Sequence, residues 1–510
     1  MEEVNKKKIA RNTIFLYFRM LLVMGISLYT SRVILEILGI TDFGIYQSVG
    51  GIVGMLTFVN SALSSGTSRF ITYELGRNDA RILRDTFSTT LTMQLILVAA
   101  IVLIAETGGT WFVTHKLTIP AEKMTAAVWA YHLSIITTAL TLVTVPFLAL
   151  IIAHEKMNTF AYVGIIEVCA KLGIVYALTL SNASRLVMYA ALLLGVQVMV
   201  SAFYFFYCRR SFGECSLRLI IDRPILKRIT GFSGWNLFAS TSIALNNQGV
   251  LVLLNMFFSP AVVAARAISL QVNNAANQFV SNFRTAVNPQ IVKQYALGNY
   301  DQSKGLLLTS TKFSYYLMLL LCLPICLGAK PLLGIWLKVV PDYTVIFLQL
   351  VIVQSLFQVF DTSFYTALYA KGDLKMNALI SPTLGFLMFP VVYVMFRCGL
   401  SPVALSWASL VVYALLGLVV KPLLIIKIVD YTWRDVLSVF RPCLLVTAAA
   451  GVPAYLLTLR VGSSGIGALC AITAICLTCS IAAIYFLGLT KSMKHKVLTT
   501  LQRTASKFTA

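Results

Sequence analysis

Charge is what this sequence lacks most. Only 12% of its 510 residues are charged, against 58% hydrophobic, and the chain has 19 acidic residues and four histidines. A water-soluble protein normally carries about twice that share of charged residues, and an acid–base enzyme needs acids or histidines gathered in a sizeable polar segment. The longest predicted outer loop, 107–125, holds one histidine and one glutamate. The sequence therefore disfavours both a soluble protein and an enzyme.

Metal, redox and nucleotide chemistry have equally little support. Most of the ten cysteines lie inside apolar stretches, and Cys322 and Cys326 have no histidine or second cysteine pair nearby. This is typical of small buried hydrophobic side chains. No ATP-binding motif is present, so we expect no cofactor and no direct coupling to ATP hydrolysis.

Long apolar stretches make up most of the chain, and its mean hydropathy is +0.83. They are continuous rather than alternating and about 20 residues long, the length that a helix needs to cross a bilayer. Only helices and closed barrels satisfy their backbone polar groups in lipid. We therefore predict an all-α polytopic membrane protein with about fourteen transmembrane helices. The predicted spans are 12–37, 44–66, 87–106, 126–152, 160–180, 186–207, 233–257, 262–287, 306–328, 343–370, 376–396, 402–426, 442–459 and 466–488.

Basic residues outnumber acidic ones by 41 to 19, which gives a formal net charge of +22. In a soluble protein this excess would suggest nucleic acid, but in a membrane protein the positive-inside rule explains it. With the N-terminus placed in the cytoplasm, the predicted inner segments hold 27 Lys and Arg and the outer segments hold seven. We therefore expect both termini in the cytoplasm and no nucleic-acid partner.

The longest predicted inner loop, 208–232, is basic and partly amphipathic, as expected of a linker that lies on an anionic membrane surface. The spans at 12–37 and 233–257 both open after a basic stretch and end at a short outer turn. An even number of spans in each half predicts a parallel repeat. We predict a six-helix lobe at 1–207, the linker at 208–232, a second six-helix lobe at 233–426, and two additional helices with a basic tail at 427–510.

Four short motifs resemble one family in the same order along the chain. LGITDFGIY, from Leu38 to Tyr46, resembles the start of Wzx-type polysaccharide (O-antigen) flippases, which belong to the multidrug/oligosaccharidyl-lipid/polysaccharide (MOP) exporter superfamily. GWNLF at 234–238, FFSPAVVAARAI at 257–268 and NPQI at 288–291 resemble the second half of its bacterial members. The chain departs from the family at Ser259, where glycine is common, and near Val263, where asparagine is common.

The resemblance implies a MATE-like pair of six-helix lobes with alternating access, in the bacterial inner (cytoplasmic) membrane. It implies a flippase that moves an undecaprenyl-pyrophosphate-linked oligosaccharide, a repeat unit of polysaccharide or lipopolysaccharide, from the inner to the outer leaflet. The polyprenyl tail would stay among the membrane lipids, and polysaccharide polymerase or ligase machinery would be the protein partner. A Na⁺ or H⁺ gradient, or the membrane potential, would reset the lobes.

The predicted span at 262–287 carries a polar stripe. Arg266, Asn273, Asn277 and Arg284 fall within about 40° of one helix face. Such a stripe cannot face lipid, because burying one guanidinium in hydrocarbon costs about 3 to over 10 kcal/mol. One interpretation is a cavity wall whose arginines bind pyrophosphate and whose amides bind sugar hydroxyls. The other is polar contact between helices inside one lobe.

The span at 12–37 also carries two arginines, Arg19 and Arg32. A straight helix would separate them by about 140°, so both can face one cavity only if the helix bends, for example at Gly25. Glu36 lies four residues after Arg32 and is a ready ion-pair partner. We predict a cavity role for Arg19 and leave Arg32 between a cavity role and an ion pair.

Three further charged residues lie inside predicted spans. Glu167 and Lys171 are four residues apart, so they either neutralise each other or titrate during ion coupling. Asp361, beside Thr362 and Ser363, is a candidate Na⁺ or H⁺ site, or lies nearer the inner edge of its span. The resemblance places Asp361 in the lobe where the superfamily's drug antiporters hold cations.

Two rival functions share the expected fold. A cation-coupled multidrug antiporter would need an acidic cavity, whereas the predicted cavity is rich in arginine and would repel cationic drugs. A flippase of a peptidoglycan-precursor lipid would share the cationic cavity, and only the GWNLF-type motifs favour a polysaccharide substrate over it.

Overall fold

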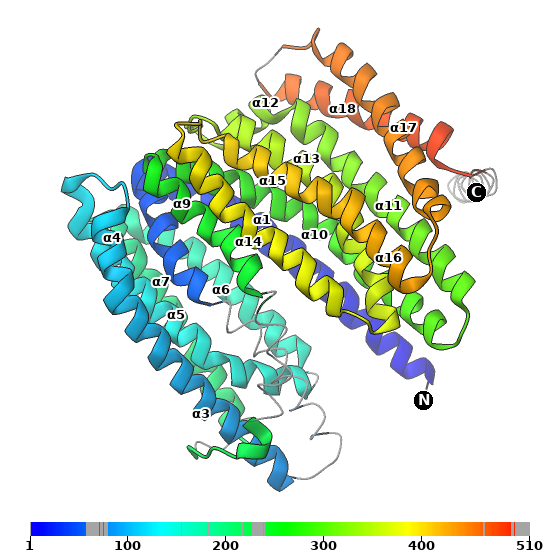
Figure 1. Ribbon diagram of the computed structural model, residues 1–510. Coiled ribbons are helices and arrows are strands. Elements are labelled where there is room, and N and C mark those ends of the chain that lie inside the picture. The colour runs from blue at the N-terminus through cyan, green and yellow to red at the C-terminus, as the bar shows by residue number, and fades with distance from the viewer. Residues whose placement is uncertain are drawn as a thin grey trace, which may run out of the picture. The chain divides into compact units, whose positions relative to one another are not determined.

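The computed structural model describes the backbone of residues 2–57, 71, 75, 80–154, 156–180, 184–215, 218–226, 238, 240–462, 465–490 and 494. It describes the side chains of these residues from 21 onward, except at 80, 157, 180 and 286. All regular elements in this part of the chain are helices, and it holds no strand (Figure 1). The predicted all-α membrane protein is therefore confirmed.

Eleven helical segments of the described chain are long and apolar enough to cross a membrane. One of them, Leu21–Leu56, covers parts of two predicted spans, 12–37 and 44–66. The predicted span at 233–257 lies partly outside the described residues, and the one at 262–287 forms a helix that is too polar to be counted. Eleven apolar segments are thus compatible with fourteen spans. They are Leu21–Leu56, Arg81–Lys116, Ala121–Ala153, Asn158–Ala177, Arg185–Ser211, Tyr300–Leu327, Thr344–Lys371, Lys375–Arg397, Ala404–Val429, Trp433–Thr458 and Ile466–Gly488.

Helix α1 (Glu2–Leu56) is two helices joined at Gly39, which has φ 80° and ψ 167°. A positive φ is readily adopted only by glycine, so the turn between the first two predicted spans falls inside the LGITDFG motif. Two contacts hold this turn: Arg185 donates to the carbonyl oxygen of Ile37 (3.0 Å), and Lys123 pairs with Asp42 (3.2 Å). Gly25, the bend expected from the arginine spacing, keeps helical dihedral angles.

The chain divides into two compact units, of which the first is Met1–Ile268 with Ala378–Ala404. In it, α5 packs against α1, α3 and α7 (Figure 1). A core forms around Tyr131, whose hydroxyl donates to the carbonyl oxygen of Ala105 (2.9 Å) at a π-helical turn. Its helices after α1 are α3 (Ala80–Ile104), η1 (Ala105–Gly109), α4 (Thr110–Lys116), η2 (Ala121–Lys123), α5 (Met124–Ala153), α6 (Met157–Ala177), η3 (Leu178–Leu180), α7 (Arg185–Ser211), η4 (Leu245–Gly249), α9 (Val250–Phe257) and most of α14 (Lys375–Arg397).

The second unit is Ser269–Asn377 with Leu405–Ala510. Helix α13 lies against α11 and α16, and α11 also contacts α17 and α18 (Figure 1). Aromatic rings fill this core: Phe360 stacks on Tyr315 at 4.9 Å and meets Phe440 edge-on at 4.8 Å. Its helices are most of α10 (Pro260–Ala296), α11 (Tyr300–Leu327), α12 (Ala329–Trp336), α13 (Thr344–Lys371), α15 (Ala404–Leu415), η5 (Leu416–Val420), α16 (Lys421–Val429), α17 (Trp433–Thr458), α18 (Ile466–Ala483) and η6 (Ile484–Gly488).

The compact units group helices by contact, and the first unit takes segments from both predicted lobes. The lobes at 1–207 and 233–426, the linker at 208–232 and the additional helices at 427–510 therefore stay predictions. Part of the linker lies outside the described residues.

Candidate functional site

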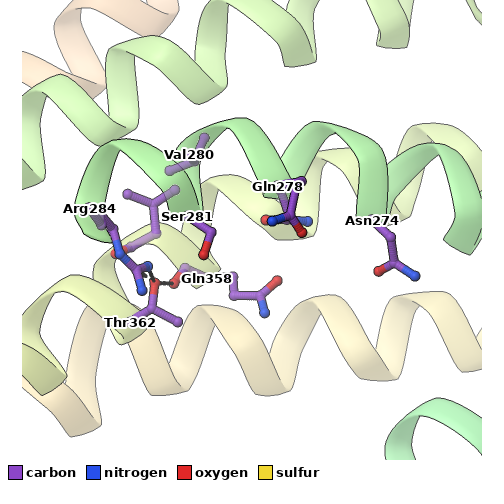
Figure 2. Close-up of a pocket in the computed structure, with 9 residues that line it drawn as sticks. Asn274, Gln278, Val280, Ser281, Arg284, Gln358 and Thr362 are labelled. Carbon is purple, nitrogen blue, oxygen red and sulfur yellow. Dashed lines mark hydrogen bonds between the residues drawn. The ribbon is translucent and has the colours of Figure 1, made fainter. Parts of the chain in front are cut away.

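A polar pocket lies between α10 and α13 inside the second unit (Figure 2). Its volume is about 320 Å³. Its lining contains amides, hydroxyls and a single charged group, a guanidinium, without a carboxylate. The lining residues are Asn274, Asn277, Gln278, Val280, Ser281, Arg284, Gln358, Val359 and Thr362.

Helical spacing explains why these side chains meet. Asn274, Gln278 and Ser281 are four and three residues apart, so they lie along one face of α10. Gln358 and Thr362 are likewise four residues apart on α13. Figure 2 shows Arg284, Ser281 and Thr362 at one end of the row, with Gln278 and then Asn274 further along α10. The pocket is therefore a row of hydrogen-bonding groups that ends at a cation.

Arg284 is held at that end by α13. Its Nη1 donates to Oγ1 of Thr362, and that hydroxyl donates in turn to the carbonyl oxygen of Gln358 (2.7 Å). Arg284 is half-buried and lies within electrostatic reach of Asp361. A guanidinium fixed in this way can present its remaining N–H groups to an anion with little loss of side-chain entropy.

Ser355 of α13 joins the two amides that the sequence places on the same stripe. Its hydroxyl donates to Oδ1 of Asn273 (2.6 Å) and accepts from Nδ2 of Asn277 (2.9 Å). Asn273 is only 6% exposed, and its hydrogen bond with Ser355 connects α10 to α13. Asn277 has two roles, since it donates a hydrogen bond to Ser355 of α13 and also lines the pocket.

Asp361 lies next to the pocket but is already paired. Its Oδ1 is 3.1 Å from Nζ of Lys421, at the start of α16, and the Lys421 side chain is 4% exposed. Ser363, its predicted hydroxyl neighbour, is buried. The predicted cation site at Asp361 therefore contains a cationic side chain of the protein itself.

The remaining predicted site residues belong to the first unit. Arg266 is 3% exposed, Arg32 is half-buried and Glu36 is exposed. The side chain of Arg19 lies outside the described residues, although its backbone is part of α1. Glu167 and Lys171 form an ion pair of 2.6 Å on α6, with side chains 30% and 41% exposed.

Sequence reasoning missed Asn274, Gln278, Gln358 and Lys421. The two α10 amides were detectable, because they repeat the helical spacing of Asn273 and Asn277 one residue later. Lys421 was detectable as a charge inside a predicted span. Nothing in the sequence signals that Gln358 would meet α10.

In the part of the chain that the structure describes, no group of three or more His, Cys, Asp or Glu side chains could hold a metal ion. The pocket's amides and hydroxyls cannot supply a general acid–base pair. The lining offers hydrogen-bond donors, hydrogen-bond acceptors and one positive charge.

Comparison with known proteins gives no match at the level of sequence. No family model matches the chain, and no curated protein matches it.

Solved structures do match. The lipid II flippase MurJ, in an inward closed conformation, has a TM-score of 0.70 at 10% identity, over 93% of this chain and 99% of that one. A multidrug resistance MATE family transporter of the MOP superfamily, in an outward-facing conformation, has a TM-score of 0.58 at 14% identity, over 82% of this chain and 96% of that one. A MOP superfamily transporter from Pyrococcus furiosus, described as having a binding pocket of reverse polarity, has a TM-score of 0.59 at 13% identity, over 82% and 96%. The chain thus has the fold of these membrane proteins.

Proposed function

We propose that the protein is a flippase that moves a polyprenyl-pyrophosphate-linked oligosaccharide from the inner to the outer leaflet of a bacterial inner membrane. The observation that supports this most is Arg284, a fixed cation at the end of a pocket lined by amides and hydroxyls. The guanidinium binds phosphate oxygens, and the amides of Asn274, Asn277 and Gln278 bind sugar hydroxyls. Both termini lie in the cytoplasm.

The size of the pocket sets how much of the substrate it holds. A volume of about 320 Å³ is near the lower end of the range for small-molecule sites. It accommodates a phosphate and the adjoining sugar, while the polyprenyl tail stays in the surrounding lipid. Recognition through the head group explains why the lining is polar although α13, which provides one side of it, is apolar enough to cross a membrane.

The shared fold supports carriage of a lipid-linked molecule, since one protein with this fold is a lipid II flippase. Another is described as having a binding pocket of reverse polarity, which indicates that the fold accommodates pockets of different polarity. Alternating access moves the head group across, driven by a cation gradient or the membrane potential. Polysaccharide polymerase or ligase machinery then receives the product.

Reconstitution in proteoliposomes tests the proposal. Flipping of an undecaprenyl-pyrophosphate oligosaccharide is measured for the wild type, Arg284→Ala and Arg284→Lys. Losing charge-assisted hydrogen bonds worth about 1.5–3 kcal/mol slows flipping about 10- to 100-fold in Arg284→Ala, and lysine restores only part of the rate, because it cannot bind in a bidentate fashion. Arg434→Ala, which removes an exposed arginine of α17, is the matched control and keeps the wild-type rate.

Two further substrates separate the rival functions. Flipping of a peptidoglycan-precursor lipid in preference to the oligosaccharide lipid would change the substrate but keep the anion site. Export of a cationic dye against a Na⁺ or H⁺ gradient, without lipid flipping, would replace the proposal by a drug antiporter. Arg19→Ala, Arg32→Ala and Arg266→Ala belong in the same series, since the sequence makes all three candidates for a cationic cavity, with an ion pair to Glu36 as the alternative for Arg32 and polar contact between helices as the alternative for Arg266.

A further inference from the structure

The second unit buries an ammonium group deep among membrane-spanning helices. Lys421 opens α16 and is 3% exposed. A buried lysine is costly unless its charge is compensated, so the groups around its Nζ are informative.

Three groups surround this ammonium. Oδ1 of Asp361 lies 3.1 Å from Nζ, Oδ1 of Asn377 accepts a hydrogen bond from it, and the centroid of the Tyr365 ring lies 5.3 Å away. They come from two helices, α13 for Asp361 and Tyr365 and the first turn of α14 for Asn377. A carboxylate, an amide oxygen and the face of an aromatic ring are groups that bind small cations in proteins. We call these three residues the ammonium cage.

The backbone before Lys421 is shaped to reach the cage. The π-helical turn η5 ends at Val420, directly before the lysine. A β-carbon at Gly417, inside this turn, would lie 2.4 Å from the carbonyl oxygen of Phe357, so only glycine permits η5 to approach α13 this closely. At the other end of α16, Lys371 of α13 donates to the carbonyl oxygen of Ile428. Both ends of α16 are thereby fixed to α13.

The charges around the cage disfavour the binding of an additional cation. Asp361 faces Lys421 and is also within electrostatic reach of Arg284. One carboxylate therefore serves two cationic side chains, and a metal ion arriving at Asp361 would be repelled by both. The sequence alone suggests Asp361 as an exchangeable Na⁺ or H⁺ site, whereas the geometry gives the carboxylate a permanent partner.

We propose that Lys421 acts as a tethered cation, occupying a site that would otherwise hold a small monovalent ion. The native cage does not bind Na⁺. Binding and release of an ion at this position therefore do not drive a conformational change. When the lysine side chain is removed, Asp361, Asn377 and Tyr365 form a vacant site for Na⁺ or for a small ammonium such as methylammonium. This inference is independent of the transported substrate.

The experiment compares purified wild-type protein with Lys421→Ala, and measures the midpoint of thermal unfolding. Each is titrated with NaCl or methylammonium chloride, with N-methyl-D-glucamine chloride, whose cation is too large for the cage, keeping the ionic strength constant. A ligand that binds only the folded state raises the midpoint in a saturable way. We expect a saturable rise of about a few degrees in Lys421→Ala and none in the wild type.

Two matched variants show whether the cage itself is responsible. Lys421→Met fills the same volume without a charge and leaves no room for an ion. Lys421→Ala with Asp361→Asn keeps the space but removes the carboxylate. Neither shows the saturable rise if the proposal holds.

The wild type keeps the test decisive even if Lys421→Ala does not fold. Saturable stabilisation of the wild type by Na⁺ that disappears in Asp361→Asn would overturn the proposal, because an external ion would then share the cage. So would a folded Lys421→Ala that responds identically to all three salts.

Discussion

A β-carbon at Gly44 would lie 1.9 Å from the backbone carbonyl oxygen of Pro260. Gly44 follows the turn at Gly39 in α1, and Pro260 is the first residue of α10. Two of the four motifs that resemble polysaccharide flippases, LGITDFGIY and FFSPAVVAARAI, are therefore in backbone contact inside the first unit. Because the Pro260 oxygen belongs to the backbone and cannot rotate away as a side chain would, the contact requires glycine at position 44.

Gly44→Ala is expected to destabilise the protein by at least about 1–3 kcal/mol, because backbone must move to admit the methyl group. The measurement is the midpoint of thermal unfolding in detergent. Gly50→Ala, on the same helix with no neighbouring atom within 4 Å of its β-carbon, is the control. It should gain about 0.5–1 kcal/mol from the better helix propensity of alanine. Equal stability of the two variants would contradict the close contact.

Ser355→Ala tests whether the Asn273 and Asn277 amides hold α10 against α13. The serine hydroxyl bonds to both amides, so its loss leaves two polar groups without their partner and should cost about 1–3 kcal/mol. Ser310→Ala is the control, because the Ser310 hydroxyl bonds only to its own helix at Leu307 among the contacts the structure describes. A cost no larger than in the control would show that the two amides find other partners.

Helical periodicity predicts only some of the residues that line the pocket. It places Arg284 and Asn277 on one face of α10, and both line the pocket. It cannot distinguish Asn273, which is buried against Ser355, from Asn274 one residue later, which faces the pocket. The two differ by about 100° around the helix, and the position of α13, rather than the sequence of α10, decides which is open.

The spans were more predictable, because about 20 apolar residues in a row have few alternatives to a membrane helix. Lys421 lies inside the predicted span at 402–426. It could have been singled out because a charged residue within a membrane span is costly and therefore unusual. Its pairing with Asp361 could not be predicted, since 60 residues separate the two and the π-helical turn η5 directly precedes the lysine. A charge inside a span reveals that a partner is needed, but not which residue provides it.

The ion pair of Glu167 and Lys171 is expected to be structural rather than part of ion coupling. Glu167→Gln or Lys171→Gln alone leaves one charge on α6 without its partner at 2.6 Å, which in a bilayer is unfavourable. Each single variant should therefore unfold at a lower temperature than the variant carrying both substitutions. The double variant should flip substrate at the wild-type rate, and a dependence of its rate on Na⁺ or pH that differs from the wild type would assign the pair to coupling.

The amide row of α10 leads to a prediction about the glycan itself, resting on the proposed function. Gln278 lies between Arg284 and Asn274 along the pocket (Figure 2), so Gln278→Leu removes hydrogen bonds to sugar hydroxyls but leaves the phosphate-binding guanidinium. One such bond is worth about 1 kcal/mol, which predicts flipping about fivefold slower for the oligosaccharide lipid. Undecaprenyl pyrophosphate without a glycan should be flipped at an unchanged rate. Gln290→Leu, an exposed glutamine on the same helix that is not part of the pocket lining, provides the control. If Gln278→Leu slows both lipids equally, the amide supports the fold of the pocket, because direct recognition of sugar would affect only the lipid that carries it.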